Sequence, residues 1–302
     1  MPGICAICPV ATLGMRKYCT SCSHFVQHVI ESAARVVALK RARRQDGFHC
    51  EYSGALLNTT DPSDPFYLHF DHRVPGVKND LAAAAAIVNE SKVKLTYLEF
   101  PLVVHEAVNH WDTGAPFRRD VVPYSAWLNG GSPVHPTNDR LVMMAVGPRL
   151  LDAGLLVPAG KGMACGVCER YAPVKNGFYC PRCGSLLFGR VEPYRVLVAA
   201  LKKAYDYELD AFICYHLGVP LEVYNWQSPY YICYDHLVPK MKGNIVVSSV
   251  LANMMKTDTD EQEWHAYFRM LDVAMQGGKF EQEKLEFKYY TRNSGLRVRK
   301  VA

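Results

Sequence analysis

The sequence predicts an α+β protein made of two tandem modules that together form a pseudo-dimer. Three features point to this fold class: an internal repeat, two separate groups of four cysteines, and a composition that suits globular domains. The chain has 302 residues, of which 49% are hydrophobic, and a net charge of +5. A chain of this length can bury enough apolar surface for two ordinary domains. We therefore expect one chain to carry two copies of one structural design.

The internal repeat relates two segments by a constant offset of 164 residues, which is the separation of Cys50 from Cys214. No gap is needed across the matched block. Further matched pairs are Gly54 with Gly218, Tyr67 with Tyr231, Pro75 with Pro239, and Asn89 with Asn253. Self-similarity at a fixed spacing is typical of a repeated structural unit.

The repeat and the loop composition divide the chain into three parts. We expect a first module over residues 1–111, a loop-rich linker over 112–160, and a second module over 161–302 that ends in a basic tail. The linker contains the stretch NGGSPVHPTN. Its Gly, Pro, Ser and Asn residues favour turns over regular elements.

Cysteine spacing predicts one metal site in each module. Eight of the eleven cysteines fall into two groups with paired C-x-x-C spacing: Cys5, Cys8, Cys19 and Cys22, and Cys165, Cys168, Cys180 and Cys183. The chain lacks secretory features, so metal binding is favoured over disulfides. Four thiolates suit structural zinc in a closed tetrahedral site. A rubredoxin-like iron site and a redox dithiol are the alternatives.

Hydrophobic patterns predict the elements of each module. Apolar residues alternate over 66–72 and 230–236, which indicates a strand with one buried face. Helices are expected over 31–44 and 194–205 before these strands, and over 97–111 and 261–275 after them. The β-branched stretch 244–250 predicts a second strand, whereas its alanine-rich partner 80–92 predicts a helix. Glu99 and Glu263 are expected to cap the final helices.

Both matched blocks contain an Asp-His pair, a nearby proline, and Asn-x-x-Lys farther along the chain. The first copy has Asp71, His72, Asp80, Asn89 and Lys92, and the second has Asp235, His236, Asn244, Asn253 and Lys256. This arrangement resembles the HNH family of ββα-metal nucleases. Here each four-cysteine zinc ribbon lies upstream of the motif.

The resemblance implies a set of roles for these residues. His72 and His236 would act as general bases, while Asp71, Asn89, Asp235 and Asn253 would bind a catalytic Mg²⁺ or Mn²⁺. Lys92 and Lys256 would contact phosphate, and Asp80 and Asn244 would orient the loop after the first strand. In a regular strand, neighbouring side chains point to opposite faces. A distorted loop is therefore expected to bring each Asp and His into one pocket.

The expected function is a metal-dependent DNA endonuclease whose two sites cut both strands of a duplex or branched DNA. RNA is not excluded as a substrate. The basic stretches 35–44 and 291–302 would neutralise phosphates. Two alternatives stay open: a non-catalytic, zinc-containing nucleic-acid-binding or assembly protein on a nuclease-derived scaffold, and a protein with one active and one degenerate half.

The sequence also gives expectations for location and assembly. It contains no apolar run of about 18 residues, the length that a membrane-spanning helix needs. Its start, MPGICAICPV, lacks a basic region followed by an apolar one. We therefore expect a cytoplasmic protein without a membrane partner, in which a monomer acts as the pseudo-dimer.

Overall fold

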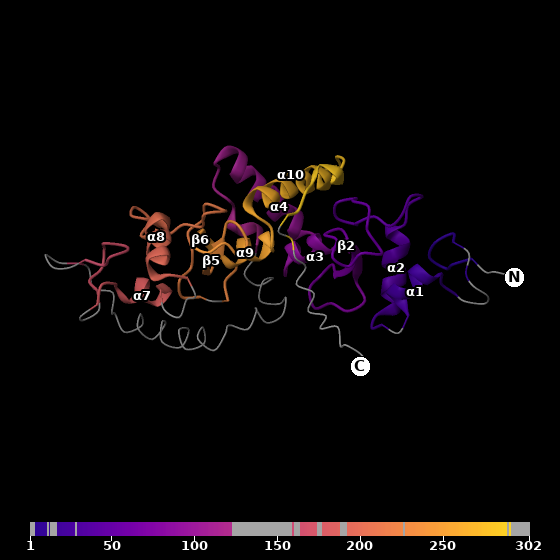
Figure 1. The fold of residues 1–302 in the computed structure, drawn as a ribbon, viewed down its shortest axis with the longest axis horizontal. Coiled ribbons are helices and arrows are strands. Elements are labelled where there is room, and N and C mark those ends of the chain that lie inside the picture. Colours follow the sequence, from indigo (N-terminus) through magenta and orange to yellow (C-terminus); the bar gives the residue numbers. More distant parts are fainter. Residues whose placement is uncertain are drawn as a thin grey trace. The chain divides into compact units, whose positions relative to one another are not determined.

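The computed structural model describes residues 4–10, 12, 17–27, 29–122, 159, 164–173, 177–187, 192–225, 227–288 and 290. Most of the expected linker and the basic tail over 291–302 lie outside the described residues. The described part combines helices with short antiparallel sheets of two strands each, as Figure 1 shows. The α+β prediction is therefore confirmed.

The described elements follow the same order in both halves of the sequence, except that the second half adds the short strands β3 and β4. The first half contains α1 (Thr20–Val26), α2 (Ser32–Ala42), β1 (Leu68–His72), β2 (Leu81–Ala85), α3 (Ala86–Lys92), α4 (Glu99–Thr113) and η1 (Arg119–Val121). The second half contains α7 (Pro181–Leu187), α8 (Tyr194–Ala204), β3 (Tyr205–Asp206), β4 (Ala211–Phe212), β5 (Ile232–His236), β6 (Ile245–Ser249), α9 (Val250–Lys256), α10 (Glu261–Met275) and η2 (Gln282–Lys284). Among the described residues, no helix is both long and apolar enough to cross a bilayer.

The chain forms two compact units that do not coincide with the two sequence halves. Unit 1 comprises residues 1–104 and 255–302, and unit 2 comprises residues 105–254. Helix α10 thus belongs to the unit that carries the first repeat, while the end of α4 belongs to the unit that carries the second. Each unit is built from segments of both halves. The expected module boundaries stay a prediction about the sequence repeat.

Each unit is organised around a β-hairpin. In unit 1, β1 pairs with β2 in antiparallel register from Leu68↔Ala85 to His72↔Leu81. In unit 2, β5 pairs with β6 from Ile232↔Ser249 to His236↔Ile245. The predicted first strands and the predicted second strand of the second module are confirmed. The short β3–β4 hairpin has no counterpart in the sequence predictions.

The prediction that residues 80–92 form one helix is wrong for its first part. Residues 81–85 form strand β2, all five of them buried, and α3 begins only at Ala86. Ala34 and Ala38 of α2 pack in a core cluster with Leu81, and Phe70 of β1 lies against that cluster. Pairing with β1 and tight packing against α2 outweigh the helix preference of alanine, which amounts to less than about 1 kcal/mol per residue.

Helices α4 and α10 begin with the same reciprocal hydrogen bonds. The Glu99 carboxylate accepts from the Thr96 backbone N–H at 2.8 Å, and the Thr96 hydroxyl accepts from the Glu99 N–H at 3.2 Å. Asp260 and Glu263 form a capping box of the same kind, with distances of 2.8 and 3.1 Å. The capping role predicted for Glu99 and Glu263 is confirmed. Such a box satisfies backbone donors that the first helical turn leaves open.

The C-terminal helix supplies much of the core of unit 1. Trp264, Tyr267, Phe268 and Leu271 of α10 are buried. The Phe268 ring lies 6.4 Å from the ring of Phe100, in the first turn of α4. Buried aromatic side chains contribute strongly to core energy. The core of unit 1 therefore requires residues from both ends of the chain.

Two glycines at matched repeat positions offer a test of the packing in unit 2. Gly54 and Gly218 both have positive φ, at 72° and 62°. A Cβ at Gly54 would meet nothing within 4 Å, but one at Gly218 would lie 3.0 Å from His110 Nε2 and closer still to Cε1. The His110 ring cannot move aside freely, because its Nδ1 hydrogen-bonds with the Ala115 carbonyl at 2.8 Å.

Alanine should therefore be tolerated differently at the two positions. Gly54→Ala should lower the free energy of unfolding by about 1–2 kcal/mol, the cost of left-handed backbone for an L-residue. Gly218→Ala should lose about 1–3 kcal/mol more through the steric conflict with His110. Urea unfolding of both variants measures the difference. Equal losses would contradict the packing of the end of α4 against the second repeat.

Candidate functional site

The two cysteine groups are arranged as metal sites. All eight side chains are buried, and within each group the sulfur atoms lie within 4.8 Å of one another. Cys8 Sγ lies 3.6 Å from Cys19 Sγ and 3.5 Å from Cys22 Sγ, and Cys168 Sγ lies 3.8 Å from Cys180 Sγ. Tetrahedral zinc with Zn–S bonds of about 2.3 Å places its sulfur ligands about 3.8 Å apart. Both groups therefore fit zinc.

The surroundings of the cysteines act in both directions: burial raises the pKa of Cys22, and hydrogen bonds with neighbouring thiols raise the pKa of Cys180 and Cys183, whereas the backbone favours the thiolate of Cys5. Burial opposes ionisation of Cys5, but backbone N–H groups, including those of Cys19 and Cys8, lower its pKa from 9.0 to about 6. In unit 2 the Val167 N–H donates to Cys165 Sγ at 3.4 Å. Metal sites of this kind contribute directly to folding, because the site exists only in the folded chain.

The Asp-His pair of each hairpin does not converge on one pocket. Asp71 pairs with Ala82 and His72 with Leu81 in a regular ladder, and the second hairpin repeats this register. The expected distortion of the strand is absent from both hairpins. Because side chains alternate along a strand, each aspartate and its neighbouring histidine point to opposite faces.

The Asp71 carboxylate is buried in a network with two partners. The Tyr52 hydroxyl donates to its Oδ2, and Lys92 Nζ lies 3.3 Å from the same oxygen. Burial raises the pKa of Asp71, while the ammonium of Lys92 opposes that rise. Asp71 thus acts as a buried acceptor that fixes β1 to its surroundings.

The Lys92 ammonium has a full set of oxygen partners. It donates to the carbonyl of His72 at 3.1 Å and to the carbonyl of Leu95, in addition to its ion pair with Asp71. Only 1% of Lys92 is exposed, and the same holds for Lys256 at the end of α9. This environment differs from the expected phosphate contact. Burial lowers the pKa of Lys92.

Unit 2 holds its aspartate in a related way. His216 Nε2 lies 2.8 Å from Asp235 Oδ2, and both side chains are buried. His216 and Tyr52 are separated by the same offset as the repeat, so one repeat position supplies the partner of the aspartate in both units. Sequence analysis missed these two residues, although the offset itself could have identified them as a pair.

In unit 1, protein partners engage the residues expected to bind Mg²⁺ or Mn²⁺. Asn89 Nδ2 lies 3.3 Å from His69 Nδ1, whereas Asp71 is engaged by Tyr52 and Lys92. In unit 2, Asp235 is engaged by His216, and Asn253 lies at the matching position on α9. A hard cation needs several oxygen ligands that point to one centre. The donor set of unit 1, with the Lys92 ammonium 3.3 Å from the Asp71 carboxylate, therefore does not fit the catalytic cation.

The two loop residues occupy equivalent backbone positions. The Asp80 carbonyl accepts from the Arg73 N–H, and the Asn244 carbonyl accepts from the Leu237 N–H, both at 3.0 Å. These bonds close the loop between the strands in the same way in both hairpins. Neither side chain is needed for this contact, which allows Asp and Asn to replace one another.

Each exposed histidine pairs with a glutamate that sequence analysis did not single out. His72 Nε2 lies 3.3 Å from Glu31 Oε2, and His236 Nε2 lies 3.1 Å from Glu192 Oε1. The histidine side chains are 41% and 37% exposed, whereas the glutamate side chains are 15% and 12% exposed. We call these the His–Glu pairs. They were missed because both glutamates lie outside the gap-free repeat.

A loop N–H holds the glutamate of each His–Glu pair in place. Asn79 N–H donates to Glu31 at 2.6 Å, and Gly243 N–H donates to Glu192 at 3.1 Å. Asn79 and Gly243 are matched by the repeat, and both have positive φ, at 64° and 78°. In both units, a strand histidine therefore pairs with a glutamate near the start of a helix, and a loop N–H holds that glutamate.

The His–Glu pairs have the chemistry of an oriented base. The Asn79 N–H, with help from His72, lowers the pKa of Glu31, and His236 and the Gly243 N–H lower the pKa of Glu192. An ionised carboxylate at Nε2 fixes the ring so that the N–H faces the glutamate. It also stabilises the imidazolium that forms when the ring accepts a proton.

Comparisons with known proteins give no further assignment: no protein-family model, no curated protein and no solved structure matches the chain. The resemblance to HNH nucleases therefore depends on the motif residues alone. The metal-site assignment depends on the two cysteine groups.

The zinc assignment predicts a stoichiometry. Elemental analysis of the purified chain should give two zinc ions per molecule, one for each group of four thiols. Cys165→Ser should reduce this to one zinc, because three thiolates no longer close the tetrahedron. Cys233→Ser, at a buried cysteine outside both groups, should leave two. Retention of both ions in the Cys165 variant would contradict the assignment.

Breaking the buried ion pair between Lys92 and Asp71 should cause a large loss of stability, and removing the second charge as well should restore most of it. Lys92→Met should lower the free energy of unfolding by about 3–5 kcal/mol, because it leaves a buried carboxylate without its cation. Lys78→Met changes an exposed lysine in the same way and should cost less than about 0.5 kcal/mol.

Denaturant titration of a third variant tests the cause of that loss. The double variant Asp71→Asn with Lys92→Met removes both charges and should recover most of the stability. If the double variant were as unstable as Lys92→Met, lost packing rather than an unpaired charge would explain the effect.

Proposed function

We propose that this chain hydrolyses phosphodiester bonds in nucleic acid, with one general-base histidine in each unit. The observation that carries the proposal is the recurrence of the His–Glu pair in both units. An exposed imidazole beside a less exposed carboxylate suits the activation of a water molecule. Two such sites in one chain match a substrate with two strands. The preferred substrate is duplex or branched DNA, and RNA is the second polymer to test.

The proposed reaction uses the histidines as proton acceptors. His72 or His236 takes a proton from water as the water attacks phosphorus, the bond from phosphorus to the leaving oxygen breaks on the opposite side, and that oxygen takes up a proton from solvent. Glu31 or Glu192 stabilises the imidazolium that results. The two zinc ions play no part in this step, because four thiolates leave no open coordination position.

Positive charge on unit 1 supports a polyanionic substrate. Lys40 and Arg41 in the last turn of α2 are exposed, and so is Arg44 just beyond it. Each phosphate that such a residue neutralises releases counterions, so binding should weaken as salt rises.

A second candidate function is nucleic-acid binding or assembly without catalysis. The observation in its favour is the burial of both aspartates with protein partners, Lys92 and Tyr52 in unit 1 and His216 in unit 2. Residues that serve a reaction are commonly left accessible to the substrate, whereas these carboxylates hold the hairpin together.

Cleavage of supercoiled plasmid separates the two candidates. The protein is incubated with plasmid, and in parallel with single-stranded RNA, in the presence of Mg²⁺, Mn²⁺ or a magnesium chelator. Linear plasmid supports two active units and open circles support one. No change in plasmid or RNA under any of these conditions would remove the hydrolase proposal and favour the binding protein.

Variants of the His–Glu pairs assign the activity to the proposed residues. His72→Ala or His236→Ala alone should convert double-strand cutting into nicking, and the double variant should abolish both. Glu31→Gln and Glu192→Gln should slow the affected unit by about 100-fold, within the usual range for loss of acid-base assistance. His105→Ala, at an exposed histidine of α4, is the matched control and should cut at the normal rate. Equal loss with His105→Ala would show that the activity does not come from the pairs.

A further inference from the structure

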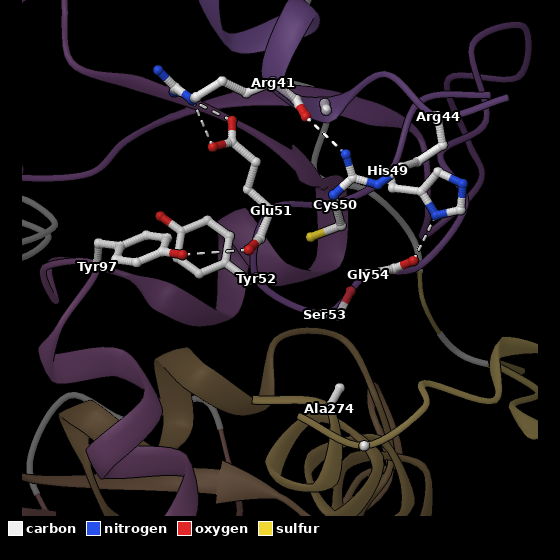
Figure 2. Close-up of a pocket in the computed structure, with 12 residues that line it drawn as sticks. Arg41, Arg44, His49, Cys50, Glu51, Tyr52, Ser53, Gly54, Tyr97 and Ala274 are labelled. Atoms are coloured by element: carbon white, nitrogen blue, oxygen red, sulfur yellow. Dashed lines mark hydrogen bonds and ion pairs between the residues drawn. The ribbon is translucent and has the colours of Figure 1, made fainter. Parts of the chain in front are cut away.

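Unit 1 contains a polar pocket whose lining includes neither residue of its His–Glu pair. Its volume is about 400 Å³, within the range of small-molecule sites, and its lining includes Arg41, Arg44, His49, Tyr52 and Tyr97. Figure 2 shows these side chains around the pocket, with Ala274 of α10 on the opposite side. The pocket is therefore formed by the end of α2, the following loop and the C-terminal helix.

The charges around this pocket leave an excess of positive charge. Arg41 Nε lies 2.9 Å from the Glu51 carboxylate, and Arg73 Nη2 lies 2.5 Å from the same group. Glu51 also accepts from the Ala83 N–H at 2.9 Å. Its negative charge is thus compensated by two guanidinium groups. Among the described residues, the Arg44 guanidinium has no carboxylate partner and donates to the carbonyls of Arg41 and Arg43, at 3.3 and 3.5 Å.

The other polar side chains of the pocket are fixed in orientation. His49 Nδ1 hydrogen-bonds with the Gly54 carbonyl at 2.7 Å, and its Nε2 lies 2.8 Å from Asp46. The rings of Tyr52 and Tyr97 lie 4.9 Å apart, and the Arg73 guanidinium lies 4.7 Å from the centre of the Tyr97 ring. A guanidinium group binds phosphate through paired N–H donors.

Unit 2 does not repeat this pocket. The bridge between Arg43 and Phe48 corresponds to the pairing of Tyr205 with Phe212. Arg44 follows Arg43 in unit 1, and Asp206 follows Tyr205 in unit 2, so the charge at this position is reversed. By the repeat offset, Ile213 stands at the position of His49. The residues at the positions of Arg44 and His49 therefore differ in chemistry between the two units.

We propose that this pocket binds a phosphate group carried by a nucleotide or by a nucleic-acid strand, with Arg44 as its principal cationic contact. The inference does not rest on the proposed hydrolysis, although Arg44 also belongs to the positive charge that favours a polyanionic substrate. It involves neither His–Glu pair, and its test measures binding without cleavage, so either proposal can fail alone.

Calorimetric titration of the full, zinc-loaded chain tests the inference. The probes are deoxyadenosine 5′-monophosphate, inorganic phosphate, deoxyadenosine and a thymidine hexanucleotide. We expect saturable binding of the probes that carry phosphate, and none of deoxyadenosine. Tighter binding of the hexanucleotide than of the mononucleotide assigns the natural ligand to a strand, and the reverse order assigns it to a free nucleotide.

A neighbouring arginine provides the matched control. Arg44→Ala should weaken binding of the mononucleotide at least 10-fold, whereas Arg43→Ala should change it less than 2-fold. Arg43 lies outside the pocket lining, with its guanidinium 5.5 Å from the centre of the Phe48 ring. Both variants remove one positive charge, so a general charge effect would weaken binding equally and overturn the proposal. Absence of saturable binding by every phosphate probe, or equal binding of deoxyadenosine, would also overturn it.

The nuclear magnetic resonance signals of the His49 ring give a second readout. They should shift when the mononucleotide is added to the unaltered chain or to the Arg43 variant, and stay unchanged in the Arg44 variant at the same concentration. Thermal unfolding of the Arg44 variant checks that the fold is kept. Lack of any shift in the unaltered chain at saturation would place the ligand elsewhere.

Discussion

A buried carboxylate on the first strand of each hairpin is the constraint on which the rest of the structure depends. Moving an ionised carboxylate out of water is costly unless hydrogen bonds and an opposite charge compensate it. Tyr52 and Lys92 meet this need for Asp71, and His216 meets it for Asp235. The register of the strand is fixed by these contacts. The next residue, a histidine, must then point to the other face, where a glutamate receives it.

Small hairpins of two strands are only marginally stable alone, and this chain supports them in two ways. Four buried thiols beside each hairpin provide a site for zinc, whose binding energy becomes folding energy. Each unit also includes a segment from the other half of the sequence. Helix α10, from the second half, belongs to unit 1, and residues 105–122, from the first half, belong to unit 2. Duplication within one chain has thus produced units that depend on both copies.

The two units share the hairpin and its contacts, and they differ in the residues around the polar pocket of unit 1. The hairpin register, the buried aspartate, the His–Glu pair and the closing hydrogen bond of the loop are the same in both. The residues around the polar pocket of unit 1 have changed in unit 2, where Asp206 replaces an arginine. Residues that must satisfy a buried charge cannot vary independently, whereas residues at an exposed pocket can. The units therefore differ where no buried charge constrains the sequence.

The sequence by itself determined the duplication, the two sets of metal ligands, most helices and the first strand of each hairpin. These features depend on spacing and on hydrophobic period, which are local properties of the chain. The tertiary structure decided that the alanine-rich segment before Ala86 is a strand, because packing on both faces outweighs a weak helix preference. It also decided that Asp71 and His72 diverge and that Glu31 and Glu192 are the partners of the histidines. Such pairings join segments far apart in the chain, and only the packing of the helices against the hairpin brings their side chains within hydrogen-bonding distance.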